Sequence, residues 1–343
     1  MSLATKYRPT EFNEVCGQQS IVNILNRQVD LRNYSNCYLL SGPSGCGKTT
    51  IARIFAHKIN NNCGNPIELD AASNNGVNNV REIIASAKER SLDSEYKVFI
   101  IDECHMITKE GWNAFLKCIE EPPKYTIFIF CTTDPQKIPE TILNRVMKFT
   151  LSKVPDILIS NRLMHICSKE GIDIDNESVQ YITKISNGGM RDAIASLDKV
   201  YQYTKFITMN TTLSMLGLYS YDSMFELTNA IVDGNKAGII EIMNTLNSNG
   251  TDLKVFVDSY IDFLLELNKY ALLGAKAVIE LPGNYVSADG SNPHSVKYAT
   301  GFEGSSKYFT DLVSKMLDAK IIIRNDSAIK NTLTILLLRM CGE

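Results

Sequence analysis

The feature of this sequence that most constrains its fold is a glycine-rich stretch at residues 42–49. Its letters, GPSGCGKT, match the phosphate-loop pattern GxxxxGKT. The stretch comes directly after an apolar run that predicts a strand (37–42) and directly before a helical pattern (49–59). Because strand, loop and helix in this order are the context that the motif requires, we expect nucleotide binding at the edge of a sheet. Without that context, the same letters would fit an ordinary glycine turn.

Each residue type in this loop has a physical task. The glycines let the backbone curl, so that its N–H groups and the N-terminus of the following helix point at phosphate oxygens. Lys48 adds a positive charge, which also makes it a candidate catalytic residue, and Thr49 supplies a hydroxyl for Mg²⁺. The expected nucleotide-binding residues of the loop are Gly42, Gly45, Cys46, Gly47, Lys48, Thr49 and Thr50.

A second apolar run, KVFIID at residues 97–102, ends in two adjacent carboxylates, Asp102 and Glu103. The first acid after such a strand is placed to face the metal ion, so we expect Asp102 to share Mg²⁺ with Thr49. The second acid, Glu103, is suited to polarise a water for attack on the γ-phosphate, a step that kinases do not need. The pair therefore favours hydrolysis over phosphoryl transfer. The alternative is two acids that simply end a strand.

The remaining apolar runs predict the architecture around these motifs. Three of them predict further strands at 66–70, 126–133 and 146–150, and their lack of alternation fits a parallel sheet covered on both faces. After residue 150 the apolar spacing becomes helical. The predicted helices span residues 156–169, 176–186, 190–203, 221–232, 236–246, 253–273 and 329–340.

Length and pattern together predict three domains, since 343 residues at about 150 per domain allow two or three. We expect an α/β domain at 1–152, a small helical domain at 153–207 and an all-helical domain at 208–343. A stretch rich in Gly, Ser, Asn and Pro at 281–306 predicts a long surface loop within the third domain.

Composition excludes several classes of protein. With 44% hydrophobic and 21% charged residues, the chain is neither disordered nor collagen-like. Its net charge of −3 means that any contact with nucleic acid needs a local basic surface. We expect an intracellular protein, because no apolar stretch approaches the roughly 18 residues of a membrane span and the N-terminus lacks a secretory signal. The nine cysteines form no CxxC pair, which predicts reduced, buried thiols.

Eight short strings follow one another over residues 4–203. They are KYRP (6–9), VCGQ (15–18), the phosphate loop, DAASNNGV (70–77), IIDECHMIT (100–108), FLKCIEEPP (115–123), TTDPQKIPETILNR (132–145) and GGMRDA (188–193). In this order they resemble the ATPase subunit of DNA sliding-clamp loaders, of the bacterial DNA polymerase III tau/gamma type. The resemblance implies an AAA+ ATPase module with a helical lid and a helical collar that assembles five subunits in an arc.

The resemblance also implies roles for individual residues toward ATP. Tyr7, Arg8 and Val15 match the adenine-side pocket of the family, although by themselves they form only a polar segment before a helix. Thr133 matches sensor 1, a polar residue beside the γ-phosphate.

Two arginines match family positions that place a guanidinium where charge develops during phosphoryl transfer. Arg191 matches sensor 2, a lid arginine that acts on the nucleotide of its own subunit. Arg145 matches the arginine finger, which is aimed at the nucleotide of a neighbouring subunit. As isolated residues, both would be interpreted as solvated surface charges.

The sequence departs from the family pattern in three places. The segment where bacterial members insert a four-cysteine zinc module is NNNCGNP, with Cys63 alone, so no zinc site is expected. The usual Ser-Arg-Cys of the finger is Asn144-Arg145-Val146. The third departure is that the sequence stops after the collar region. We therefore do not expect the contacts with helicase and polymerase that tau-type subunits make. A compact loader of a phage or of a reduced replication system would have such a sequence.

The resemblance implies DNA contact through helix N-termini and basic residues that follow the duplex backbone without reading bases. The candidates are Lys109 and Lys117, together with Asn74 and Asn75 in the loop 74–77. Relatives often carry Arg or Lys where this chain has Asn74 and Gly76, so we expect fewer charges per subunit. The alternative for both lysines is a solvated, charged helix.

We therefore expect a clamp-loader motor that uses ATP to open a sliding clamp and load it onto primer-template DNA. Its expected partners are the clamp, the DNA, other copies of itself and an accessory subunit, in the cytoplasm at replication sites. One alternative is a non-hydrolysing scaffold subunit of the same assembly, but Lys48, Thr49, Asp102 and Glu103 are all present. Another is a different AAA+ enzyme on DNA, such as a branch-migration motor; the KYRP and EEPP strings and the helical third domain argue against it.

Overall fold

The computed structural model describes residues 2–216, 221–248, 251–279, 281, 285–286, 292–301 and 305–341. The chain forms two compact units, Met1–Phe206 and Ile207–Glu343, and each is described by itself. The expected boundary at residue 152, within the first unit, stays a prediction.

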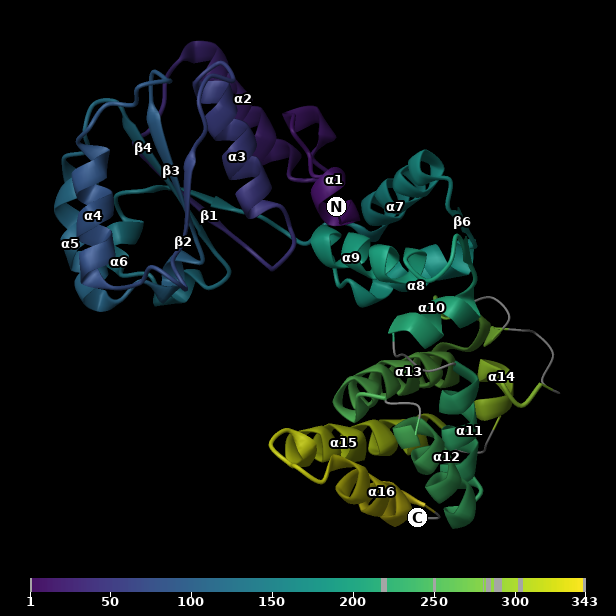
Figure 1. Ribbon diagram of the computed structural model, residues 1–343. Helices are drawn as coiled ribbons and strands as arrows, with labels where there is room; N and C mark the ends of the chain where they lie inside the picture. The colour runs from purple at the N-terminus through teal and green to yellow at the C-terminus, as the bar shows by residue number, and fades with distance from the viewer. Residues whose placement is uncertain are drawn as a thin grey trace. The chain divides into compact units, whose positions relative to one another are not determined.

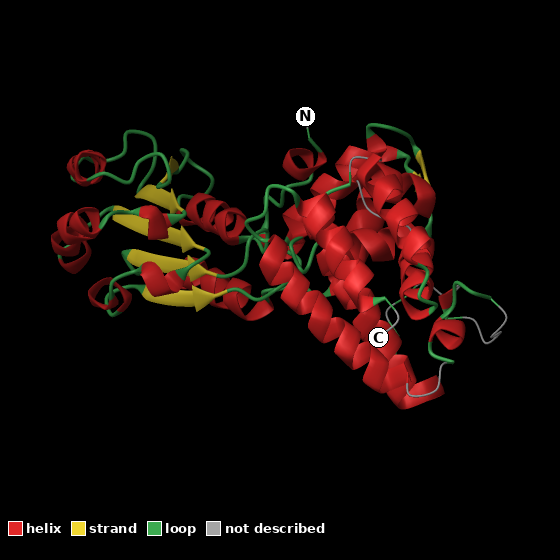
Figure 2. Cartoon of the chain, turned by 90° about the horizontal axis from the view of Figure 1, so that it is seen from below, coloured by secondary structure: helices red, strands yellow, loops and turns green. Residues whose placement is uncertain are grey.

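A five-stranded parallel sheet forms the centre of the first unit, and its arrows point the same way in Figure 2. The strand order is β2-β3-β4-β1-β5. The strands are β1 (Cys37–Ser41), β2 (Ile67–Asp70), β3 (Lys97–Asp102), β4 (Thr126–Thr132) and β5 (Met147–Thr150). The predicted α/β class is confirmed, and each strand ends within one residue of its predicted bounds.

Helices cover both faces of this sheet (Figure 1). On one face, Tyr38 and Leu40 of β1 share a core with α2 (Gln19–Leu31) and α3 (Lys48–Ile59). On the other face, Leu39 shares a second core with α4 (Val77–Ala87), α5 (Lys109–Glu120) and α6 (Glu140–Leu143). Since successive residues of a strand face opposite sides, burial on both faces requires the uninterrupted apolar runs found in the sequence.

Three helices follow the sheet within the first unit. They are α7 (Asp156–Glu170), α8 (Asn176–Ile185) and α9 (Met190–Tyr201), each within two residues of its predicted bounds. The side chain of Asp175 caps α8 by accepting a hydrogen bond from the backbone N–H of Ser178 at 2.7 Å. Ile159, Leu163 and Leu197 are buried in the core that these helices enclose. The N-terminal helix α1 (Leu3–Lys6) packs against α9.

Short elements connect the larger ones. They are the 3-10 turns η1 (Phe12–Glu14), η2 (Cys104–Met106), η3 (Pro135–Lys137) and η4 (Gly274–Lys276), and a two-stranded ribbon of β6 (Asp173–Ile174) and β7 (Phe206–Ile207).

The second unit is helical, with α13 packed along α15. Its helices are α10 (Met209–Leu216), α11 (Tyr221–Val232), α12 (Lys236–Ser248), α13 (Leu253–Leu273), α14 (Val296–Ala299), α15 (Ser305–Ile323) and α16 (Ile329–Met340). The buried hydroxyl of Tyr260 lies 2.8 Å from that of Thr228, which ties α13 to α11. Among the described residues, no helix combines the length and the apolar character needed to cross a bilayer.

Two features of the second unit differ from the sequence prediction. Helix α15 was not predicted, although Phe309, Leu312 and Met316 lie buried at helical spacing along it. The segment 281–306 is not simply a surface loop, because α14 lies within it and Val296 is fully buried. Turn-forming residues surround α14, so only its burial selects that helix, whereas the apolar spacing of α15 is itself a helical signal that the prediction did not use. Residues 282–284, 287–291 and 302–304 of the predicted loop lie outside the described residues.

We predict that Phe128→Ala destabilises the first unit by about 3–5 kcal/mol, the usual cost of removing a fully buried aromatic side chain. The Phe128 ring is fully buried and lies 5.3 Å from that of Phe99. Urea unfolding can be followed through Trp112, the single tryptophan, which is buried on the same face of the sheet. The matched control is Leu92→Ala, which removes a fully exposed side chain and should change stability by no more than about 0.5 kcal/mol. Equal effects of the two substitutions would contradict this packing.

Candidate functional site

The phosphate loop leaves β1 through a backbone conformation that only glycine adopts easily. Gly42 has a φ of +150°, and a Cβ at this position would lie 2.6 Å from the carbonyl oxygen of Leu151. Its N–H donates to the carbonyl of Thr132 in β4 at 3.2 Å. The loop is therefore held between the chain that follows β5 and the end of β4.

The second glycine of the loop lets the chain pass close to α9. Gly45 has a φ of +70°, and a Cβ there would lie 3.1 Å from the Cα of Gly189. The N–H of Arg191 points at the Gly45 carbonyl at 3.5 Å. The GGMRDA string is thus the part of the sequence that brings the N-terminus of α9 against the phosphate loop.

Helix α3 begins at Lys48 and presents its N-terminus to the loop. The Lys48 side chain is buried, and its Nζ donates to the carbonyls of Gly42 (3.0 Å) and Pro43 (2.8 Å). Gly47 caps the helix with a φ of +106°. The Cys46 side chain belongs to the core shared with α2 and α3, and burial raises the pKa of its thiol. These contacts direct the lysine along the loop, where it can neutralise phosphate charge.

The hydroxyl of Thr49 and the carboxylate of Asp102 meet at the carboxyl end of the sheet. Thr49 Oγ1 donates to Asp102 Oδ2 at 2.7 Å. Paired hydroxyl and carboxylate oxygens are ligands that Mg²⁺ prefers, usually with water and phosphate completing the octahedron. The donor set present in this structure therefore fits this ion.

Glu103 has a left-handed backbone conformation, with φ 46° and ψ 41°. Its N–H donates to Asp102 Oδ1 at 3.0 Å, and its Oε2 accepts a hydrogen bond from Thr133 Oγ1 at 3.0 Å. Non-glycine residues in this region are uncommon and cluster at functional sites. The structure thus brings together Glu103 and Thr133, which lie 30 residues apart in the sequence.

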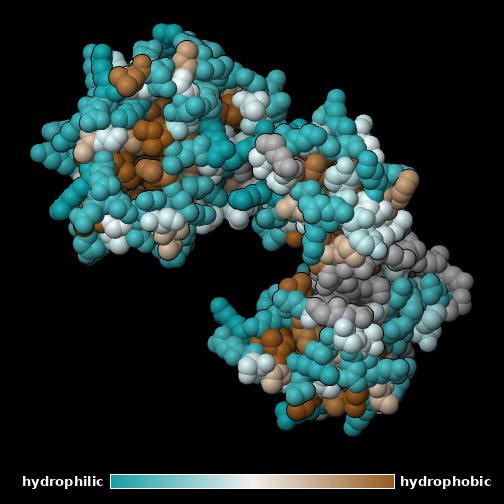
Figure 3. Space-filling model, viewed as in Figure 1, coloured by the Kyte–Doolittle hydropathy of each residue, from teal (hydrophilic) through white to brown (hydrophobic). Residues whose placement is uncertain are grey.

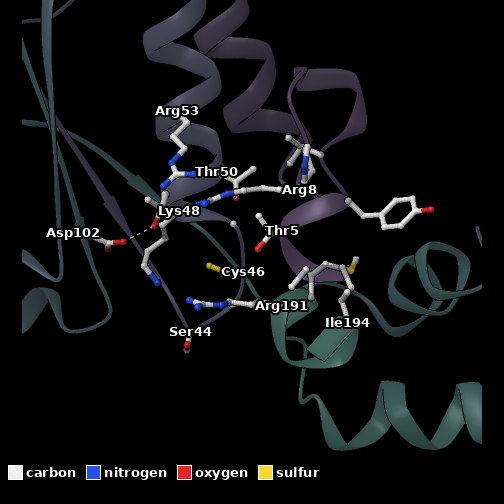
Figure 4. A pocket seen from close by; sticks show the side chains of 18 of the residues that line it. Thr5, Arg8, Ser44, Cys46, Lys48, Thr50, Arg53, Asp102, Arg191 and Ile194 are labelled. Carbon is white, nitrogen blue, oxygen red and sulfur yellow. Dashed lines mark hydrogen bonds between the residues drawn. The ribbon is translucent and has the colours of Figure 1, made fainter. Parts of the chain in front are cut away.

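Cationic side chains line a cavity of about 590 Å³ beside the phosphate loop. They come from the N-terminal segment (Arg8), from α3 (Lys48 and Arg53), from α7 (Arg162) and from α9 (Arg191). Figure 4 shows Arg8 and Arg191 reaching toward the loop. Burial lowers the pKa of Arg8, and the positive charge of Arg53 contributes to this shift. A polyanion in the cavity would relieve the repulsion among these charges.

The remaining predicted nucleotide-binding residues lie on the same side of the cavity. Arg8 Nε donates to Thr50 Oγ1 at 3.1 Å, which connects the N-terminal segment to α3. Tyr7 and Val15 line the cavity, and Val15 also packs against the core under α3. The structure therefore brings the predicted adenine-side residues together with the phosphate loop.

The N-terminal segment is also bonded to the helices that follow the sheet. The backbone N–H of Leu3 donates to Asp198 in α9 at 3.0 Å, and the carbonyl of Tyr7 accepts from Arg162 in α7 at 2.8 Å. The Tyr7 hydroxyl donates to Glu170 at the end of α7, and this bond raises the pKa of Tyr7. Residues 3–8 therefore connect α7 and α9 to α3.

Arg145 lies outside the residues that line this cavity. Its guanidinium donates to the carbonyl of Thr141 at 2.7 Å and pairs with Glu120 of α5 at 2.7 Å. The Arg145 and Glu120 side chains are 40% and 46% exposed. The arginine is thus displayed at the surface of the first unit and does not contribute to the cavity of its own chain.

Three of the predicted DNA-contacting residues lie at the N-termini of α4 and α5, and the fourth, Lys117, lies in the last turn of α5. Asn74 and Asn75 precede α4, and the carbonyl of Asn75 accepts from the N–H of Thr108, the residue that caps α5, at 3.2 Å. Lys109 and Lys117 are exposed on α5. Two helix N-termini with an exposed lysine, Lys109, at the start of one of them suit contact with phosphate groups.

The sequence prediction missed several residues of the site. Arg53 lies one turn after Thr50 on α3 and pairs with Glu68 of β2, and both side chains line the cavity. Helical spacing of three residues from Thr50 could have indicated Arg53. His105 lies 3.3 Å from Glu103, and its place within the DECH string could have indicated it. Glu170 has no distinguishing sequence feature, since only the fold brings it to Tyr7.

Three family models match the chain. The model described as DNA polymerase III, delta subunit, matches residues 67–155. The model for the DNA polymerase III clamp loader subunit, ATPase lid domain, matches residues 158–203. The model for DNA polymerase III subunits gamma and tau, domain III, matches residues 207–286.

The curated relatives described next are all named as tau, gamma/tau or gamma subunits of DNA polymerase III. DNA polymerase III subunit tau of Bacillus subtilis is 33% identical over 297 residues, which are 80% of this chain and 53% of the relative. The gamma/tau subunit of Mycoplasma genitalium is 32% identical, over 78% of this chain and 49% of the relative. The chain spans about half the length of these two. The gamma subunit of Buchnera aphidicola is 34% identical over 76% of this chain and 78% of the relative.

Solved structures of the Thermotoga maritima RuvB Holliday junction branch migration motor share the fold. One of them superposes with a TM-score of 0.52 and 21% identity, covering 77% of this chain and 92% of the other. At this identity the likeness concerns the fold alone.

We predict that the cavity binds inorganic tripolyphosphate and that Lys48→Ala weakens this binding about tenfold or more, the range for a lost charge-assisted hydrogen bond. Isothermal titration calorimetry measures the dissociation constant. The matched control is Lys58→Ala, at the far end of the same helix, where the lysine pairs with Glu11 and does not line the cavity. If both substitutions weaken binding equally, net charge and not the loop geometry determines the affinity.

Proposed function

Because the chain belongs to the DNA polymerase III gamma/tau family of clamp-loader subunits, we propose that it is an ATP-driven motor subunit of such a loader. ATP binding assembles a spiral of subunits that opens a ring-shaped sliding clamp and grips primer-template DNA. Hydrolysis then releases the closed clamp. Residues 1–152 form the nucleotide-binding domain, 153–207 the lid and 208–343 the collar.

One observation carries this proposal. The segment that matches the clamp-loader lid, residues 158–203, carries Arg191 into the cavity beside the phosphate loop. The family-specific part of the chain and the general phosphate-binding part therefore share one site. A lid arginine in contact with the loop is suited to respond to the presence of a phosphate chain.

The residues of the cavity divide the work of hydrolysis. Thr49 and Asp102 would hold Mg²⁺, which would supply positive charge that neutralises the phosphates. Lys48 neutralises phosphate charge from the loop side. Glu103 accepts a proton from the attacking water, and Thr133 orients the Glu103 carboxylate through its 3.0 Å hydrogen bond.

Arg145 acts on the nucleotide of a neighbouring subunit. Its surface position supports this proposal, because a guanidinium outside its own cavity is free to enter another one. The ion pair with Glu120 is an exposed one, and such pairs contribute about 0–1 kcal/mol. Releasing Arg145 from Glu120 therefore costs little compared with the several kcal/mol that an arginine finger supplies.

The DNA duplex lies against the N-termini of α4 and α5 and along α5, where Lys109 in the first turn and Lys117 in the last turn contact phosphates. The collar joins copies of the chain to one another and to an accessory subunit, in the cytoplasm at replication sites. Figure 3 shows apolar residues between hydrophilic ones on the surface of the second unit. Leu317 and Ile321, one turn apart on α15, are 46% and 73% exposed, which supports contact with another chain.

We predict that ATP hydrolysis rises when primer-template DNA and the clamp encoded in the same genome are both present.

We also predict that Glu103→Gln binds ATP with unchanged affinity but hydrolyses it at least about 10²-fold more slowly, since glutamine cannot accept the proton. A phosphate-release assay measures turnover, and fluorescent ATP measures binding. Hydrolysis that ignores both DNA and clamp would favour another AAA+ activity, and wild-type turnover in Glu103→Gln would remove Glu103 from the mechanism.

We predict that Arg145→Ala lowers hydrolysis by about 10³-fold or more, as removal of an arginine finger does, while ATP binding changes much less. The decisive measurement mixes Arg145→Ala with Lys48→Ala, each inactive alone, under conditions where subunits assemble. A finger that acts in trans gives partial rescue, because an intact Lys48 site then lies beside an intact Arg145.

Two controls make this experiment specific. Glu120→Ala, which removes the partner of Arg145 in the free subunit, should leave hydrolysis close to the wild-type rate. Co-assembly of the two inactive variants is verified by light scattering. Absence of rescue despite co-assembly, or full activity of Arg145→Ala alone, would show that the finger role is wrong.

A further inference from the structure

His105 lies between the proposed water-activating carboxylate and the rigid end of the sheet. Its Nδ1 is 3.3 Å from Glu103 Oε2 and 3.1 Å from Thr132 Oγ1. The His105 side chain is only 12% exposed. It belongs to η2, which directly follows Glu103, so a short, tightly turned segment carries both residues.

Thr132 gives His105 a fixed anchor. It is the last residue of β4 and is fully buried. Its Oγ1 also accepts a hydrogen bond from the backbone N–H of Asp134 at 3.0 Å, which holds the hydroxyl in place. A histidine bonded to this oxygen is therefore positioned by the sheet itself.

The contact with Thr132 fits either tautomer of His105, since a hydroxyl can donate or accept, so the contact with Glu103 is the one that distinguishes the two tautomers. A carboxylate has only lone pairs, so a bare Nδ1 at 3.3 Å from Glu103 Oε2 would face it with lone pair against lone pair. An Nδ1–H instead donates toward both Oε2 and Thr132 Oγ1. The geometry thus favours the tautomer with hydrogen on Nδ1, whereas free histidine in water prefers hydrogen on Nε2.

Glu103 needs such support. Its side chain is 39% exposed, and an unheld glutamate loses rotamer entropy when it is fixed in one geometry. His105 and Thr133 both approach Oε2, on one side of the carboxylate. Two donors on one oxygen set the orientation of the other, Oε1.

We propose that His105 is a positioning residue for hydrolysis: through Nδ1–H it holds Oε2 of Glu103, so that Oε1 is directed at the attacking water. This inference rests on the proposed function, since it concerns the same Glu103. Thr132, His105 and Glu103 form a connection from the rigid end of β4 to the site of water activation.

The first test is a double-mutant cycle. We expect His105→Ala to lower kcat about tenfold or more, the scale of a misplaced catalytic group, with the dissociation constant for ATP unchanged. In the Glu103→Gln background the same substitution should change kcat by less than about twofold, because a residue that acts through Glu103 has nothing left to position. Equal losses in the two backgrounds would overturn the proposal.

Conservative variants separate the hydrogen bond from simple packing. His105→Asn keeps an N–H close to the position of Nδ1 and should recover part of kcat relative to His105→Ala. His105→Gln places its amide near Nε2 instead and should not. Equal rates in all three variants would overturn the role of Nδ1.

The second test needs neither nucleotide nor activity. With ¹⁵N-labelled histidine, long-range ¹H–¹⁵N spectra of the free protein report the tautomer of each of the four histidines. We expect His105 to carry its proton on Nδ1, and Glu103→Ala to shift it toward Nε2. An Nε2–H tautomer in the wild-type protein would overturn the inference.

The outcomes also distinguish this inference from the proposed function. If Glu103→Gln is slow but His105→Ala turns over at the wild-type rate, only the inference about His105 fails. If Glu103→Gln itself turns over at the wild-type rate, the proposed mechanism fails and the inference fails with it.

Discussion

Burial of both faces of the parallel sheet is the constraint on which the rest of the first unit depends. Helices α2 and α3 cover one face and α4 and α5 the other, so the strands carry apolar residues on both sides. Polar groups are then left at the strand ends, and in a parallel sheet all carboxyl ends meet at one edge. For this reason the phosphate loop, Asp102 and the Thr132–Thr133 pair converge, although up to 90 residues separate them.

Close approach of backbones then joins the lid to this edge. Gly45 and Gly189 allow the N-terminus of α9 to lie where any Cβ would collide, and Arg191 follows directly. On the other side, residues 3–8 bond to α7, α9 and α3. Hydrogen bonds from one short segment therefore join α7 and α9 to the helix that begins at the phosphate loop.

The polar groups of the site differ in how firmly they are held. Lys48 is buried and bonded to loop carbonyls, and Asp102 is bonded to Thr49, so both are held by contacts within the chain. Arg145 and Glu120 form an exposed pair that separates at little cost. The fixed groups suit binding within the chain, and the weakly held arginine suits a contact formed only when a neighbour arrives. Glu103 is partly exposed and is bonded through Oε2, so it is held less firmly than Lys48 and more firmly than Arg145.

The sequence by itself determined the α/β class, the bounds of the strands, the helices α3, α7, α8, α9, α11, α12, α13 and α16, and the phosphate loop with Asp102 and Glu103. Local patterns encode these features: apolar runs, helical spacing and glycines at positions of positive φ. It did not predict α14, because turn-forming residues surround that helix and only its burial selects it, and the helical spacing of apolar residues along α15 was overlooked. The sequence also did not predict three side-chain contacts: that of Arg53 with Glu68, that of Tyr7 with Glu170, and that of Glu103 with His105. Which charged side chain finds which partner depends on distances between elements far apart in the chain, and only the tertiary structure decides those distances.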